Sequence, residues 1–352
     1  MNLKKLIHII PTLKSGGAEN VLVRLVEELD KLGVEQTVIT LSGSKSDFNY
    51  AKIVNFCNVL NSKKSNLKID QLLREKEIKI IAWMYKSIFY VQLKLFLKGI
   101  NKKVYWNIRH SNFGIFQFYQ KLSLYFFGFL SKILRPNIIY CSYKSKIEHE
   151  KYFFSEEKNL VIQNNLAKKF KKINLDKAFL NFKYFLFVGR FNQQKSPKDL
   201  KKIGENLLLS NPDYKLVIIG RNWKLSYFSK KIRNKIHLIG EVDNLESYYF
   251  NSECMFFTSK FGEGYPNVLV EASVFGTPIV GFDAGDSGEI LKNYKYGHLV
   301  SNNDEFVSKV ESIIKAKRSI KEINKVISYQ KKVLSFEKTV QKYYSFLFEN
   351  LK

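Results

Sequence analysis

The sequence predicts an α/β protein built from two doubly wound, Rossmann-like domains that face a cleft. Apolar runs suited to buried strands alternate with helical patterns along nearly the whole chain, and this alternation restarts near residue 184. With 352 residues, 45% of them hydrophobic, the chain is too long for one typical core and sufficient for two. The expected boundaries are two domains at 1–167 and 177–335, a linker at 168–176, and a C-terminal helix at 336–352 that crosses back to the first domain.

The first domain begins with a parallel strand–turn–helix–strand unit. An apolar run predicts a strand over residues 5–10, and apolar residues at helical spacing over 21–29 predict a helix that ends at Gly33. Residues 35–41 follow as the second strand. Further strands, with helices between them, are expected at residues 78–84, 103–108, 137–142 and 160–165.

The second domain repeats this alternation. A strand at residues 184–188 is followed by a loop at 189–197 and a helix at 198–209. A helix at 267–275 leads into a strand at 278–281. The remaining elements are expected as strands at 215–219, 235–239 and 254–258 and a last helix at 336–351. Doubly wound sheets bind ligands at the carboxyl ends of their strands, so the loops after strands hold the candidate residues.

The formal net charge of +26 is distributed unevenly. Residues 1–175 hold 30 basic and 13 acidic residues, net +17, whereas residues 176–352 hold 28 and 19, net +9. No acidic residue occurs between Glu77 and Glu148. Basic charge mixed with aromatic residues suggests attraction to an anionic membrane surface or to nucleic acid. The larger positive charge of the first half favours the membrane, because a nucleic-acid-binding protein is expected to spread its charge over both halves.

The densest aromatic stretch, residues 113–130, lies inside this acid-free segment. Lys121 and Lys132 interrupt the apolar run, so it is too short to span a membrane, which needs ~20 apolar residues. Two interpretations stay open: a core helix with a lysine-rich solvent face, or a segment that lies on a membrane surface.

The remaining composition argues for a metal-free protein in a reducing compartment. The three cysteines are Cys57, Cys141 and Cys254; they are far apart and form no cluster with metal-ligand spacing. The N-terminal apolar run is too short for a signal peptide. No Asp-x-Asp pair occurs, which argues against a carboxylate-bound Mg²⁺. We therefore expect no cofactor and no metal.

Two carboxylates eight residues apart, Glu263 and Glu271, form the strongest functional signal. A Gly-Tyr-Pro-Asn turn separates Glu263 from an apolar helix whose N-terminus is suited to an anion. Since Val268, Leu269, Val270, Ala272 and Val274 make this helix apolar almost all round, Glu271 is costly to bury without a hydrogen-bond partner. A pocket for a phosphorylated sugar or nucleotide is the functional interpretation.

Two cations occupy the loop after the first strand of the second domain. Arg190 directly follows the strand and Lys195 closes the loop, so both can neutralise a diphosphate. Such loops are often merely solvated, but the expected strand order places this one near Glu263.

The first domain offers two weaker candidates. Gly16 and Gly17 lie in the first strand-to-helix turn, where glycine permits close approach of a ligand, although a simple tight turn explains them as well. Arg109 and His110 follow the strand at 103–108, and His110 could hydrogen-bond a sugar or carry a proton. A structural role for His110 is an equal alternative.

Together these motifs resemble the retaining glycosyltransferases of family 4 (group 1), which have the GT-B fold. Residues 263–272 are similar to the family's Glu-Gly-(Phe/Tyr)-Pro-Asn-x-x-x-Glu-Ala motif, residues 189–195 to its Gly-Arg…Lys loop, and residues 16–19 to its Gly-Gly-x-Glu turn. Gln163 and Asn165 depart from the family's usual Val-Ile-Pro-Asn-Gly segment. The resemblance spans nearly the whole chain and is most specific in the second domain.

The resemblance implies a nucleotide-diphosphate-sugar donor held mainly by the second domain. Arg190 and Lys195 would bind the diphosphate, and Glu271 the ribose. His110, Glu263, Arg190 and Lys195 would act in catalysis. The remaining donor contacts implied are Gly16, Gly17, Val242, Gly264, Asn267, Val268 and Leu269, with the loop at 240–244 near the base.

The resulting hypothesis is a retaining, metal-independent glycosyltransferase that acts on a lipid-linked saccharide acceptor in bacterial surface polysaccharide or lipopolysaccharide synthesis. Its expected location is the cytoplasm, peripheral on the inner face of the plasma membrane, with no nucleic-acid partner. Two alternatives remain: a sugar-nucleotide epimerase or phosphorylase of the same fold, and a basic nucleic-acid-binding protein.

Overall fold

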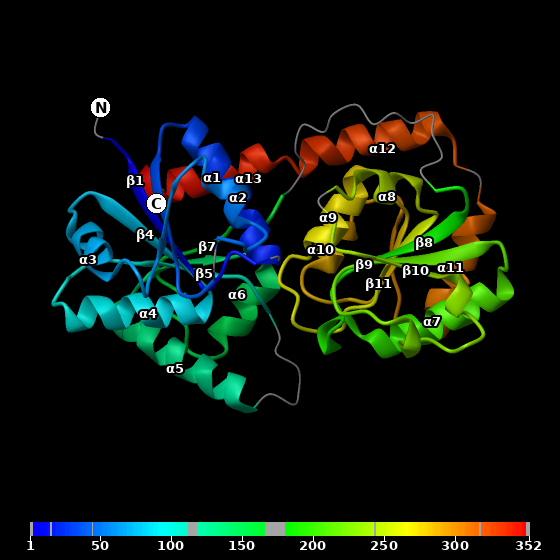
Figure 1. Cartoon of the computed structure of the whole chain (residues 1–352), viewed down its shortest axis with the longest axis horizontal. Helices are drawn as coiled ribbons and strands as arrows, with labels where there is room; N and C mark the ends of the chain where they lie inside the picture. The colour runs from blue at the N-terminus through cyan, green and yellow to red at the C-terminus, as the bar shows by residue number, and fades with distance from the viewer. Residues whose placement is uncertain are drawn as a thin grey trace. The chain divides into compact units, whose positions relative to one another are not determined.

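The computed structural model describes residues 3–14, 16–43, 45–111, 118–165, 180–242, 244–316 and 318–349. The chain divides into two compact units, Met1–Asn164 with Glu337–Lys352 and Asn165–Phe336. In each unit, helices cover both faces of a parallel sheet (Figure 1). The linker expected at 168–176 lies outside the described residues.

The first unit has a seven-stranded parallel sheet in the order β3-β2-β1-β4-β5-β6-β7. Its strands are β1 Lys5–Ile10, β2 Glu35–Thr40, β3 Asn58–Asn61, β4 Ile78–Trp83, β5 Tyr105–Ile108, β6 Asn137–Tyr140 and β7 Asn159–Val161. Its helices are α1 Gly17–Lys31, α2 Tyr50–Ile53, α3 Asn66–Arg74, α4 Met84–Leu97, α5 Phe118–Leu134, α6 Tyr143–Glu150 and α13 Phe336–Phe348.

Alternation along β1 divides the core of this unit between the two faces of the sheet. Ile7 and Ile9 join one hydrophobic cluster with buried residues of α3, α4 and α5. His8, on the opposite side of the strand, contacts Gln36 and Trp83 through hydrogen bonds of 3.1 and 3.3 Å. The C-terminal helix α13 belongs to this unit, because the Tyr343 hydroxyl accepts a 3.0 Å hydrogen bond from Asn107 of β5.

The second unit has a six-stranded parallel sheet in the order β10-β9-β8-β11-β12-β13. Its strands are β8 Lys183–Val188, β9 Tyr214–Ile219, β10 Ile236–Gly240, β11 Cys254–Phe257, β12 Ile279–Gly281 and β13 Gly297–Leu299. Its α-helices are α7 Pro197–Ser210, α8 Glu246–Asn251, α9 Asn267–Val274, α10 Ser287–Leu291, α11 Asn303–Lys315 and α12 Ile320–Val333. Short 3-10 helices are η1 Gln193–Lys195, η2 Leu225–Tyr227 and η3 Arg233–Lys235.

The second core explains why its strands read as continuous apolar runs. Phe185 and Phe187 of β8 pack with α7 and α11 on one face, while α9 contacts β12 on the other. A strand buried on both faces shows no polar alternation. Both sheets follow the doubly wound strand order, so the predicted fold class is confirmed.

Three features of the chain differ from the sequence prediction. The strands β3 and β13 were not predicted, because their short, mixed sequences Asn-Val-Leu-Asn and Gly-His-Leu carry little apolar pattern. Helix α5 does not present a lysine-rich solvent face: Leu124 and Phe127 are buried, but its outer side chains are mainly apolar and exposed. Residues 112–117, the start of the aromatic stretch, lie outside the described residues.

Candidate functional site

The strongest candidate site lies at the carboxyl edge of the second sheet. There β8 and β11 are hydrogen-bonded neighbours, although β9 and β10 come between them in the chain. The connections after β8 and after β11 lead to opposite sides, which makes this the topological switch point where doubly wound sheets bind ligands. Strand pairing thus brings together the loop with Lys195 and the loop with Glu263, as the sequence predicted.

Lys195 and Glu263 form an ion pair across this switch point. Lys195 Nζ lies 2.6 Å from Glu263 Oε1, and their side chains are only 15% and 10% exposed. The Ser259 hydroxyl donates a 2.8 Å hydrogen bond to the same carboxylate oxygen. A nearly buried ammonium is therefore held in place by a carboxylate that is itself hydrogen-bonded.

The backbone of Lys195 is fixed as firmly as its side chain. The Asn192 side chain accepts a 3.1 Å hydrogen bond from the Lys195 N–H, and the Thr258 hydroxyl donates a 2.6 Å bond to the Lys195 carbonyl. The next residue, Ser196, adopts a left-handed conformation with φ of 44° at the N-cap of α7. Such a conformation costs about 1–3 kcal/mol and persists because the surrounding contacts hold it.

The backbone of Gly285, in the loop after β12, packs closely against the Glu263 loop. Gly285 has φ of +61°, and a Cβ there would lie 2.4 Å from the Gly264 carbonyl oxygen and 2.7 Å from that of Glu263. The Asp286 N–H donates a 2.8 Å hydrogen bond to the Gly264 carbonyl. Only glycine fits this close approach of two backbones, so residue 285 sets the position of Glu263.

Helix α9 carries the second predicted carboxylate. It begins after Pro266, so the positive end of its dipole adjoins the Glu263 loop. Tyr249 of α8 donates a 3.0 Å hydrogen bond to Glu271 Oε2, and its ring stacks against Phe275. Leu269, Val270, Ala272 and Val274 are buried as predicted, whereas Asn267, Val268 and Glu271 are half-buried and line the less covered side.

Arg190 differs from Lys195 in its surroundings. Its side chain is exposed and makes no ion pair with another residue in the described part of the chain. The backbone just before it is packed: Trp223 donates a 2.7 Å hydrogen bond to the Gly189 carbonyl, which a Cβ on Gly220 would approach to 2.3 Å. Arg190 thus carries an exposed charge on a well-packed stretch of backbone. Val242 is half-buried in the loop after β10, and its neighbour Asp243 lies outside the described residues.

In the first unit, the predicted residues lie at the carboxyl ends of β1 and β5. Gly16 is the N-cap of α1 and Gly17 its first residue. Gly16 has extended backbone with φ of −176°, which any residue adopts. A Cβ on it would lie 2.3 Å from an oxygen of the flexible Glu19 side chain, so the fold itself does not demand glycine here.

His110 lies in an aromatic cluster after β5. Its ring packs edge-on to Tyr85, with centroids 5.1 Å apart, and lies 5.6 Å from the ring of His149. Burial, and then the nearby His149, lower the pKa of His110 to about 3. At neutral pH the ring is an uncharged imidazole, suited to hydrogen bonding rather than to a standing positive charge.

Comparison with known proteins gives the enzyme class. Residues 168–333 match the family model described as Glycosyl transferases group 1. The chain is a glycosyltransferase. It is 25% identical over 335 residues to an uncharacterized glycosyltransferase of Haemophilus influenzae, with 89% of each chain covered.

One further relative and one solved structure extend the comparison to the whole length of this glycosyltransferase. A Campylobacter jejuni GalNAc-α-(1→4)-GalNAc-α-(1→3)-diNAcBac-PP-undecaprenol α-1,4-N-acetyl-D-galactosaminyltransferase is 25% identical over 350 residues, with 91% of each chain covered. The crystal structure of Anabaena HepE in complex with UDP superposes with a TM-score of 0.78 at 16% identity, covering 99% of this chain and 100% of that one. The superposition shows that the glycosyltransferase has the GT-B fold.

Sequence reasoning missed several residues that support the predicted site. Ser259 could have been found from the sequence, because it lies two positions beyond the end of β11. Loops that follow parallel strands are where ligand-binding residues are expected. Tyr249, Gly285 and Asp286 come from other elements, and only the folded chain shows that they reach Glu271 and the Glu263 loop. Nothing in the sequence around His149 indicates that its ring lies beside His110.

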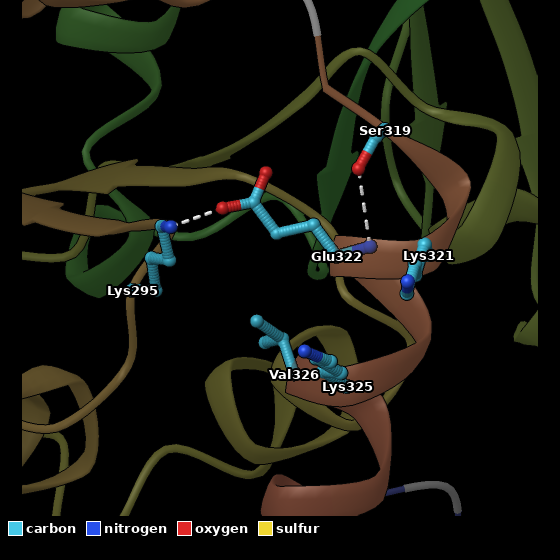
Figure 2. Close-up of a pocket in the computed structure, with 6 residues that line it drawn as sticks. All are labelled: Lys295, Ser319, Lys321, Glu322, Lys325 and Val326. Carbon is cyan, nitrogen blue, oxygen red and sulfur yellow. Dashed lines mark hydrogen bonds and ion pairs between the residues drawn. The ribbon is translucent and has the colours of Figure 1, made fainter.

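A separate hollow of about 520 Å³ lies between Lys295 and the first turns of α12 (Figure 2). Lys295 pairs with Glu322 there, and Ser319 caps α12 by accepting a 3.2 Å hydrogen bond from the Glu322 N–H. None of the predicted donor residues lines it, and its other lining groups are Lys321, Lys325 and Val326. We do not assign it to the glycosyltransferase site.

Neither a metal-binding cluster nor a membrane-spanning helix occurs among the described residues. No three or more His, Cys, Asp or Glu side chains among them are grouped closely enough to hold a metal ion. Within the same residues, no helix combines the length and apolar character needed to cross a membrane.

Proposed function

We propose that the protein is a retaining, metal-independent glycosyltransferase of family 4. It transfers a sugar from a nucleotide-diphosphate sugar to a hydroxyl of a lipid-linked saccharide in bacterial surface polysaccharide or lipopolysaccharide synthesis. The observation that carries the proposal is the Lys195–Glu263 pair, a fixed cation at the ligand-binding edge of the sheet. Its place of action is the inner face of the plasma membrane.

The donor diphosphate takes the place of Glu263 as the partner of Lys195. In the described structure Glu263 balances the Lys195 charge at 2.6 Å. A diphosphate carries more negative charge than one carboxylate, so it competes effectively for this ammonium and recruits Arg190 from solvent as a second cation. Glu263 is then free to turn towards the donor sugar. A carboxylate can therefore lie in a site for an anionic donor, because it contacts the sugar and not the phosphates.

The remaining contacts follow the arrangement around α9. Glu271, oriented by Tyr249, accepts hydrogen bonds from the ribose hydroxyls. The α9 N-terminus, with Gly264, Asn267, Val268 and Leu269 beside it, faces the phosphates. Val242 lies near the base. For the first unit, Gly16, Gly17 and His110 stay predicted donor contacts, and neutral His110 is suited to hydrogen-bond a sugar hydroxyl.

The reaction requires no protein nucleophile in this proposal. The acceptor oxygen bonds to the anomeric carbon on the face from which the diphosphate leaves, while the bond between that carbon and the phosphate oxygen breaks. The acceptor proton passes to the departing phosphate oxygen. Arg190 and Lys195 stabilise the negative charge that develops there, a preorganised electrostatic effect worth roughly 10²–10³ in rate for each donor removed.

Two relatives support the choice of substrates. The Campylobacter jejuni relative is named for an undecaprenol-linked acceptor, and Anabaena HepE was crystallised with UDP-glucose as well as UDP. We therefore propose a nucleotide sugar as the donor, with UDP as the first nucleotide to test, and a polyprenol-linked saccharide as the acceptor.

The test is donor turnover by the Arg190→Ala, Lys195→Ala double variant. We expect a loss of at least about a hundredfold, because both cations that face the diphosphate are gone. The matched control is Lys198→Ala with Lys202→Ala, which removes the same charge from exposed positions of the adjacent α7. Turnover of the Arg190, Lys195 variant close to that of the control would refute the site assignment.

A further inference from the structure

The outer faces of α4 and α5 carry two stripes of exposed apolar side chains. On α4, Phe89, Leu93, Phe96 and Leu97 recur at helical spacing, opposite the buried Ile88, Val91 and Leu95. On α5, Leu122, Tyr125, Phe126, Phe129 and Ile133 do the same, opposite the buried Leu124 and Phe127. We call these nine exposed residues the α4–α5 apolar surface.

The two stripes form one continuous surface rather than two separate ones. The helices lie side by side in the first unit (Figure 1), and the rings of Phe89 and Phe126 join them, with centroids 6.3 Å apart. Phe96 is 82% exposed and Phe129 66%, so each helix projects a large aromatic side chain into solvent. Exposed apolar patches of this extent mark interaction sites, because leaving them in water is unfavourable.

Both helices carry lysines, and acidic residues neutralise only some of them. Both helices lie in the segment between Glu77 and Glu148 that has no acidic residue. Lys94 and Lys98 are neutralised by Asp70 of α3, at 2.6 and 3.0 Å. Lys86, Lys121 and Lys132 are exposed and form no ion pair with another described residue.

We propose that the α4–α5 apolar surface docks this protein on an anionic lipid bilayer. Phe96 and Phe129 enter the boundary between headgroups and acyl chains, while Lys86, Lys121 and Lys132 meet anionic headgroups. The proposal deepens the proposed function and rests on its lipid-linked acceptor, since docking would bring the enzyme to the plane where that acceptor lies.

The combination of lysines and apolar side chains on the α4–α5 apolar surface argues against a second copy of the chain or a nucleic acid as its partner. A second copy of this chain would bring the same lysines towards one another across a two-fold axis in a protein of net charge +26. A nucleic acid would satisfy the lysines but would leave the nine apolar side chains uncovered. A bilayer surface supplies both anionic groups and an apolar layer at the required depth.

The experiment is co-sedimentation of the full chain with vesicles of 3:1 phosphatidylethanolamine and phosphatidylglycerol, compared with phosphatidylcholine vesicles. Wild type should bind the anionic vesicles at least tenfold more tightly than the neutral ones. Phe96→Ser with Phe129→Ser, and separately Lys121→Glu with Lys132→Glu, should each weaken binding to the anionic vesicles at least tenfold. Matched controls are Leu67→Ser with Ile320→Ser, at equally exposed apolar positions elsewhere, and Lys198→Glu with Lys202→Glu.

The proposal is overturned if the Phe96, Phe129 variant binds anionic vesicles like its control, or if wild type binds neutral vesicles equally well. A change from dimer to monomer in this variant, with vesicle binding intact, would instead assign the surface to a second copy. UDP-induced thermal stabilisation, measured without vesicles, should be equal in wild type and both test variants, which verifies folding. If UDP stabilises none of them while vesicle binding behaves as expected, the donor proposal fails and the docking surface stands.

Discussion

The sheets of the two units share the order of six strands, but their carboxyl edges carry different side chains. In the second unit, charged groups are fixed in pairs: Lys195 with Glu263 by an ion pair, and Glu271 with Tyr249 by a hydrogen bond. In the first unit the same edge carries the neutral His110 in an aromatic cluster, and the outer helices present apolar side chains to solvent. A common scaffold can thus be specialised for an anionic ligand in one copy and for uncharged groups and a lipid surface in the other.

The largest expected difference between the units is their response to acid. In the first unit, burial lowers the pKa of His8 and His149 to about 4 and that of His110 to about 3. In the second unit, burial also lowers the pKa of His237 and His298, but both are only half-buried and the shift is smaller. Each first-unit histidine is neutral when folded but takes up a proton near pH 6.5 when unfolded, so its stabilising contribution is lost as pH falls from 6.5 towards 4. At pH 5.0 this amounts to about 2 kcal/mol for each histidine.

Hydrogen exchange at pH 7.5 and pH 5.0, corrected for intrinsic rates, measures this difference directly. Amides of β1 and β4 should lose protection on acidification by far more than those of β8 and β9. Equal losses in both sheets would contradict the assignment of acid sensitivity to the first unit.

The next largest effect is expected from Gly285→Ala in the second unit. The added Cβ would meet two carbonyl oxygens at 2.4 and 2.7 Å, on top of the strain of a positive φ, and should destabilise the unit by about 4 kcal/mol. Gly240→Ala is the matched control: its φ is +80°, but no atom lies within 4 Å of the added Cβ. Urea unfolding should separate the two variants, and an equal loss in both would show that backbone strain alone matters.

Lys195→Ala and Arg190→Ala should differ in their effect on the free energy of unfolding, because only Lys195 also stabilises the fold. Removing Lys195 takes away the cation beside the nearly buried Glu263 carboxylate, at a cost of roughly 3 kcal/mol. Arg190 is exposed and has no ion-pair partner among the described residues, so its loss should change the unfolding free energy by less than about 0.5 kcal/mol. Both variants should bind UDP more weakly than wild type. Equal stability of the two variants would contradict the structural part of this comparison.

Tyr249→Phe should have the smallest effect. It deletes the 3.0 Å hydrogen bond to Glu271 but keeps the ring that stacks on Phe275, so the cost to stability is about 1 kcal/mol. If Glu271 binds the ribose, this variant should also bind UDP several-fold more weakly than wild type. If titration shows unchanged UDP affinity for Tyr249→Phe, Glu271 does not bind the ribose.

Pattern and spacing predicted most of the fold because the elements concerned are locally determined. The apolar runs of β1 and β8 and the helical spacing of α1 are visible in the sequence itself. The switch-point pairing of the Lys195 and Glu263 loops also followed, because parallel strand order brings strand ends together. What could not be predicted depends on distant segments: the approach of Gly285 to Gly264, the reach of Tyr249 to Glu271, and the exposure of the outer face of α5.

The central claim is that Glu263 holds Lys195 until the donor diphosphate replaces it. Calorimetric titration of UDP into wild type, Glu263→Gln and Lys195→Ala tests it most directly. Glutamine keeps the size of the side chain but removes the competing charge, so Glu263→Gln should bind UDP more tightly than wild type, while Lys195→Ala should bind it more weakly. Weaker or unchanged UDP binding by Glu263→Gln would contradict the claim.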